Sequence, residues 1–80
     1  MYLTLDIAMR PIEGALVRAL SLVERRGYPV RRVTSSTGDV LKLELEVELG
    51  TRSAEHLVRK LEGLEDVCKV DVVRNVGGRA

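Results

Sequence analysis

The chain has 80 residues, with 13 basic side chains, 12 acidic side chains and a single cysteine, Cys68. This length predicts one small domain whose core needs additional stabilisation. Because there is only one cysteine and one histidine, an internal disulfide and a Cys/His zinc site are both excluded. Association between chains is then the expected source of stability. A net charge of +1 argues against a general attraction to nucleic acids or anionic membranes.

Other function classes are excluded by the apolar and aromatic content. No apolar run approaches the roughly 20 residues that a membrane-spanning helix needs. The start of the sequence lacks the basic and apolar regions of a signal peptide, so we expect a cytoplasmic protein without membrane association. Tyr2 and Tyr28 are the only aromatic residues, which argues against a sheet that stacks on nucleobases.

The first half of the chain predicts a strand, a helix and a second strand. Apolar residues alternate over residues 2–9, as in a strand with one buried face. The period then changes to three and four, which predicts a helix that ends at Gly27. Residues 28–34 form a weaker strand, and Pro29 favours an edge position for it. A hairpin loop is expected over residues 35–39. The helical apolar stripe comprises Ile12, Ala15, Leu16, Ala19, Leu20 and Val23.

The second half predicts a strand, a helix and a final strand. Leucine or valine occupies every second position from Leu41 to Leu49, with charged residues between them. Ser53 is a typical N-cap for the helix that follows, and Gly63 ends it. In the last strand, residues 67–73, Cys68 is expected in the core. Residues 75–80 are expected to be a flexible tail, so that a single domain spans residues 1–74.

The order of elements is therefore strand, helix, strand, strand, helix, strand. One apolar sheet face and two apolar helix stripes predict a two-layer α+β sandwich. Right-handed crossovers in both halves give the ferredoxin-like βαββαβ arrangement, with an antiparallel four-stranded sheet and both helices on one face.

Few residues suggest chemistry. His56 lies off the apolar stripe of its helix and has no evident orienting partner, so we interpret it as a surface residue and expect no catalytic residue. No phosphate-binding glycine loop or metal motif is present. The densest basic patch could hold a phosphate, but the missing aromatic rings weigh against nucleic acid. This patch consists of Arg25, Arg26, Arg31 and Arg32.

Gly14 is unusual near a helix start, because glycine costs about 1 kcal/mol relative to alanine inside a helix. At a helix N-terminus the missing side chain leaves room for a small anion, such as the carboxylate of an amino acid, beside free N–H groups. Close packing against another chain is the alternative explanation, and both remain open at this point.

Three short motifs occur in an order that resembles a known family. The first helix starts with Glu13-Gly14-Ala15-Leu16 and ends with Arg26-Gly27-Tyr28, and a later run reads Leu61-Glu62-Gly63-Leu64-Glu65-Asp66-Val67. Over residues 2–74 the chain resembles an ACT domain, most closely that of the small regulatory subunit of acetolactate synthase. It resembles the short class of these subunits, which has no second domain.

This resemblance implies a non-catalytic regulatory subunit that assembles with a large catalytic subunit in branched-chain amino-acid biosynthesis. Thiamine diphosphate, Mg²⁺ and FAD would belong to that partner, and no cofactor is expected in this chain. A small amino-acid effector would bind at Pro11, Ile12, Glu13, Gly14 and Ala15. Glu13 replaces the family's usual proline, and Pro11 replaces a polar residue that contacts the effector. We expect weak binding, because Glu13 would repel an effector carboxylate.

A homodimer is expected from the open edge of the second strand, and the resemblance implies it as well. Pairing two such edges, through Tyr28, Val30, Arg31 and Val33, would give a continuous eight-stranded sheet. Two alternative functions remain: a free-standing amino-acid-sensing ACT protein with another target, and a small nucleic-acid-binding ferredoxin-like domain.

Overall fold

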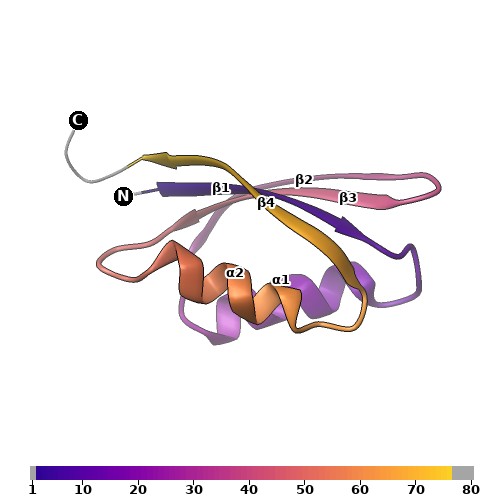
Figure 1. Cartoon of the computed structure of the whole chain (residues 1–80), viewed down its shortest axis with the longest axis horizontal. Helices are drawn as coiled ribbons and strands as arrows, with labels where there is room; N and C mark the ends of the chain where they lie inside the picture. Colours follow the sequence, from indigo (N-terminus) through magenta and orange to yellow (C-terminus); the bar gives the residue numbers. More distant parts are fainter. Residues whose placement is uncertain (1, 77–80) are drawn as a thin grey trace.

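The computed structural model describes residues 2–76 as a sheet with two helices packed on one face (Figure 1). The elements are β1 (Tyr2–Met9), α1 (Ala15–Arg25), β2 (Val30–Thr37), β3 (Leu41–Glu48), α2 (Ala54–Glu62) and β4 (Val67–Val76). All strand pairs are antiparallel, in the order β2-β3-β1-β4. The predicted α+β sandwich is therefore confirmed. No helix within residues 2–76 is long and apolar enough to cross a membrane.

The core lies between the sheet and the helices and follows from the alternation in β1 and β3. Leu5 pairs with Leu45 at the centre of the sheet, and both side chains are fully buried. Tyr28 is only 3% exposed and also belongs to this core. The buried helical residues are Ala15, Ala19 and Val23 from α1, and Leu57 and Leu61 from α2. The charged side chains of β3 consequently lie on the opposite, open face of the sheet.

Helix α1 begins at Ala15, later than the apolar period predicted. Gly14 has a φ of 83°, in the left-handed region, and cannot belong to a right-handed helix. Ile12 consequently lies in the preceding turn, where it is 43% exposed. The predicted end of the helix is confirmed, because Gly27 has a φ of 86° just after it.

Helix α2 begins as predicted. The Ser53 hydroxyl accepts a hydrogen bond from the backbone N–H of His56 at 3.3 Å, which is the expected N-cap contact. The side chain of His56 is exposed, so its interpretation as a surface residue is confirmed.

Strand β2 is shifted toward the C-terminus relative to the prediction. Tyr28 precedes the strand, and its N–H is bonded to the carbonyl of Val23 at 3.2 Å, so it belongs to the turn that leaves α1. At the other end, pairing with β3 continues until Thr37 lies opposite Leu41. The first residues of the predicted hairpin loop are therefore part of the strand, since their backbone groups find partners in β3.

Strand β4 does not keep the predicted alternation. Ala8 pairs with Lys69 and Met9 pairs with Val67, so Cys68 is the extra residue of a bulge. Cys68 is therefore exposed, and its predicted place in the core is wrong.

A second irregularity lies further along β4, at Val73. Val72 pairs with the buried Leu5 but is itself 50% exposed, because β4 is an edge strand with a neighbour on one side only. The strand continues to Val76, so residues 75 and 76 belong to it rather than to the predicted tail. The rest of that tail, residues 77–80, lies outside the described residues.

Candidate functional site

The five residues predicted to bind an effector lie together at the start of α1. Pro11, Ile12, Glu13, Gly14 and Ala15 line an open hollow of about 300 Å³. The other lining residues are Leu16, Val17, Thr37 and Leu41. The hollow therefore combines exposed apolar side chains with the backbone at the start of a helix.

The backbone at this helix start has unused hydrogen-bond donors. The N–H of Ala15 donates to the carbonyl of Ile12 at 3.1 Å, and the N–H of Arg18 donates to the carbonyl of Gly14 at 2.9 Å. The intervening two N–H groups, of residues 16 and 17, have no backbone acceptor in the described part of the chain. The first turn of α1 contains no acidic residue. These donors and the helix dipole together favour a negatively charged group at the hollow.

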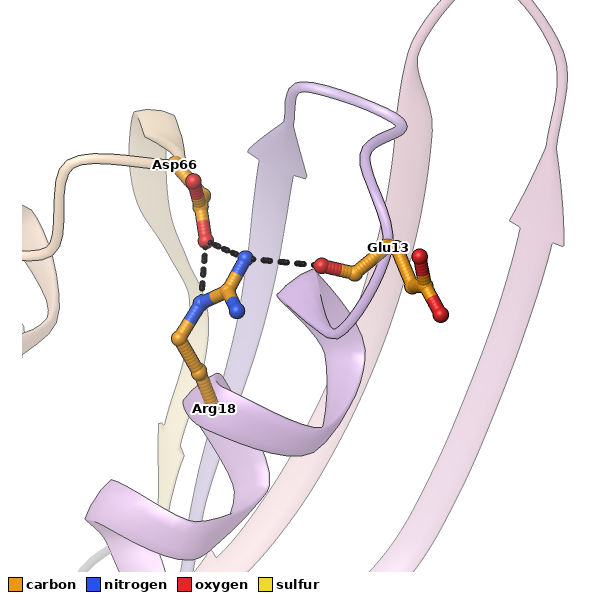
Figure 2. A network of polar contacts seen from close by, with 3 residues as sticks. All are labelled: Glu13, Arg18 and Asp66. Atoms are coloured by element: carbon orange, nitrogen blue, oxygen red, sulfur yellow. Dashed lines mark hydrogen bonds and ion pairs between the residues drawn. The ribbon is translucent and has the colours of Figure 1, made fainter.

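Arg18 joins α1 to the loop before β4 (Figure 2). Its Nε donates to Asp66 Oδ2 at 2.6 Å, and its Nη2 lies 2.5 Å from the same oxygen. Nη2 also donates to the carbonyl of Glu13 at 3.0 Å. Asp66 is 7% exposed, and its carbonyl accepts a hydrogen bond from the N–H of Arg10 at 2.8 Å. The ion pair therefore holds the β1–α1 connection against the α2–β4 connection.

The position of Arg18 gives Gly14 a structural role. A Cβ on Gly14 would lie 2.7 Å from Arg18 Nη1, and the positive φ disfavours a side chain in any case. The fold therefore favours glycine at this position with or without a ligand. The Glu13 carboxylate is exposed and points away from Arg18 (Figure 2), so the guanidinium does not neutralise it.

A second arginine has a similar place at the other end of α1. Arg52 Nη1 donates to the carbonyl of Arg26, and the guanidinium carbon lies 4.9 Å from the centre of the Tyr28 ring. Gly27 allows this approach, because a Cβ there would lie 2.8 Å from Arg52 Nη1. Neither contact of Arg18 and Arg52 can be recognised in the sequence, because their partners are 48 and 26 residues away along the chain.

The predicted basic patch is divided in the structure. Arg31 pairs with Glu48 at 3.4 Å, and Arg32 lies 4.0 Å from Glu46, so both are neutralised on the strands. The other two arginines of the patch lie at the end of α1, on a different part of the surface.

The predicted dimer edge is largely the open side of β2. Arg31 and Val33 are exposed, and Val30 is partly exposed. Tyr28 precedes the strand and its side chain is buried, so it is the one predicted edge residue that β2 does not contain.

The open face of the sheet holds a row of acidic side chains. Asp6 pairs with Glu44 on one side and with Asp71 on the other, and all three line a hollow of about 300 Å³. They are not placed to share a cation: within residues 2–76, no three His, Cys, Asp or Glu side chains form a potential metal site.

Comparison with known proteins supplies the family. A family model described as an ACT domain matches residues 11–70. The chain belongs to the ACT domain family. Such domains are regulatory and non-catalytic, which agrees with the absence of catalytic residues expected from the sequence. No curated protein matches the chain.

Solved structures show the same fold. The crystal structure of the ACT domain from GTP pyrophosphokinase of Chlorobium tepidum superposes with a TM-score of 0.78 at 15% identity, over 91% of this chain and 97% of that one. The solution NMR structure of the same domain superposes with a TM-score of 0.80 at 15% identity, over 95% of this chain and 89% of that one. The solution structure of the C-terminal domain of the MgtC protein from Mycobacterium tuberculosis superposes with a TM-score of 0.66 at 20% identity, over 89% of this chain and 83% of that one. At these identities the similarity establishes the ferredoxin-like fold and no individual function.

Proposed function

We propose that this ACT domain binds a small aliphatic amino acid at the start of α1 and regulates a partner enzyme. The observation that carries the proposal is the hollow formed by residues 11–17 with Thr37 and Leu41. The N–H groups of residues 16 and 17, which have no backbone acceptor within residues 2–76, suit a carboxylate. Ile12 and Val17, which are 43% and 65% exposed, suit an aliphatic side chain.

The charge of Glu13 is expected to keep this binding weak. Valine, leucine and isoleucine should have dissociation constants of about a millimolar or weaker, equivalent to about −4 kcal/mol. Replacing Glu13 with glutamine should tighten binding, because it removes the negative charge beside the effector carboxylate. The matched control is Glu24→Gln, which changes the same charge at the exposed far end of α1.

Titration calorimetry on the three proteins decides the question. Micromolar valine binding to the unmodified chain would contradict the repulsive role of Glu13. If none of the three amino acids binds to the unmodified chain or to Glu13→Gln, the proposed amino-acid site is wrong.

We also propose that the domain acts as a homodimer through β2. The two edges of the sheet differ, because β4 has two bulges that hinder pairing, whereas β2 has one irregularity, between Val30 and Arg32. Val33 is 41% exposed on β2. Val33→Lys should produce a monomer in sedimentation velocity, while Val73→Lys on the other edge should leave the dimer intact. Dissociation by Val73→Lys alone would show that the wrong edge was chosen.

The partner we propose is the large catalytic subunit of acetolactate synthase, on the strength of the sequence resemblance. Mixing the purified chain with that subunit should give one co-eluting species in size-exclusion chromatography and a change in its activity. A chain that is dimeric and binds amino acids but does not bind the large subunit would instead be a free-standing sensor with another target.

A further inference from the structure

A third hollow lies where α1 ends and α2 begins. These two helix ends lie together, at the opposite end of the helical layer from the start of α1 (Figure 1). It has a volume of about 440 Å³ and is open to solvent. The lining residues are Arg26, Tyr28, Arg52, Ser53 and His56. The proposed amino-acid site and the proposed dimer edge do not involve this hollow.

The guanidinium of Arg52 is held in place before any ligand arrives. It donates through Nη1 to the carbonyl of Arg26, lies over the Tyr28 ring and packs against the bare Cα of Gly27. Its Nε and Nη2 have no acceptor in the described part of the chain. A donor group that is already oriented loses less conformational entropy when it binds an anion.

The positive charge at this hollow is not compensated. Within residues 2–76, the side chains of Arg26 and Arg52 form no ion pair, whereas Arg18 pairs with Asp66. Glu55, in the first turn of α2, is exposed and does not line the hollow. Two of the lining residues are therefore arginines without an ion pair in the described part of the chain, and their uncompensated positive charge attracts an anion.

We propose that this hollow binds a phosphate group carried by a small molecule. The oriented guanidinium of Arg52 and the second positive charge of Arg26 favour the double charge and several oxygens of a phosphate over the single charge of a carboxylate. The volume lies within the range of about 300–1,000 Å³ that is usual for small-molecule sites. Tyr28 is 3% exposed beneath Arg52, so its ring cannot stack on a nucleobase, which disfavours nucleic acid as the ligand.

NMR titration of the ¹⁵N-labelled chain with inorganic phosphate and pyrophosphate, at constant ionic strength, tests the proposal. Saturable shifts are expected for the amides of residues 26–28 and 52–56. Arg26→Gln should weaken pyrophosphate binding about tenfold or more, through loss of a charge-assisted hydrogen bond. It keeps the backbone carbonyl that Arg52 binds, so the fold is retained. Arg59→Gln removes the same charge from an exposed site outside the hollow and should change affinity less than about twofold.

Amide shifts that do not saturate with either anion would overturn the proposal. Equal losses of pyrophosphate affinity in Arg26→Gln and Arg59→Gln would also overturn it. A single-stranded oligonucleotide that binds far more tightly than pyrophosphate, with a steep salt dependence, would also overturn it in favour of nucleic acid. The Glu13→Gln variant should bind pyrophosphate normally, so failure of the amino-acid site and failure of this site are distinguishable.

Discussion

Replacing Gly14 with alanine tests whether Arg18, as well as backbone conformation, requires a glycine there. The φ of 83° should cost a residue with a side chain about 1 to 2 kcal/mol. The new Cβ would also lie 2.7 Å from Arg18 Nη1, so the guanidinium must move and weaken its bonds to Asp66. Because the Arg18 side chain is 49% exposed, solvent screens this loss, and we expect it to add about 1 to 2 kcal/mol. The total loss of unfolding free energy is then about 2 to 4 kcal/mol.

Two other glycines separate these contributions. Gly50 has a φ of 64° but nothing within 4 Å of an added Cβ, so Gly50→Ala should lose only the backbone part, about 1 to 2 kcal/mol. Gly38 has neither a positive φ nor a close neighbour, and Gly38→Ala should change stability by no more than about 0.5 kcal/mol. In an Arg18→Ala background, Gly14→Ala should lower the unfolding free energy by no more than Gly50→Ala does.

Urea unfolding followed by circular dichroism measures each free energy, and the double-mutant cycle gives the coupling between Gly14 and Arg18. A coupling of about 1 to 2 kcal/mol is expected. Equal losses from Gly14→Ala and Gly50→Ala in the unmodified chain, together with a coupling near zero, would refute the reasoning.

Two further predictions concern the sheet. Leu45→Ala should destabilise the protein by about 2 to 5 kcal/mol, because this leucine is fully buried. Glu46→Ala, on the open face of the sheet, should destabilise it by less than about 1 kcal/mol. Similar losses of stability in urea melts would show that the two faces are assigned wrongly. Cys68 should react completely with a thiol reagent in the folded protein, because the bulge exposes it; a thiol that reacts only in denaturant would contradict the bulge.

The sequence was sufficient wherever the structure depends on near neighbours along the chain. The alternation from Leu41 to Leu49 predicted the buried and charged faces of β3 correctly, because a strand's side chains alternate whatever its partners are. The Ser53 cap and the stop at Gly27 were predicted for the same reason, since each depends on a few adjacent residues.

Features that depend on distant residues could not be predicted. The exposure of Cys68 depends on how β4 pairs with β1, since one extra residue reverses the faces beyond it. The contact between Arg18 and Asp66 joins residues that only the completed fold brings together. Grouping Arg25, Arg26, Arg31 and Arg32 by their proximity along the chain was misleading, because the turn between α1 and β2 sends the two pairs to different surfaces.

The motifs behind the resemblance to acetolactate synthase subunits have structural roles in this chain. Gly27 is required by its positive φ and by the approach of Arg52, and Tyr28 fills part of the core. Leu61 is likewise fully buried. Any chain with these two helix ends needs similar residues, so the motifs identify the ACT fold more strongly than a particular partner. We therefore expect ACT proteins to differ in ligand and target at residues that the fold leaves free, such as the exposed Glu13 and Arg26 of this chain.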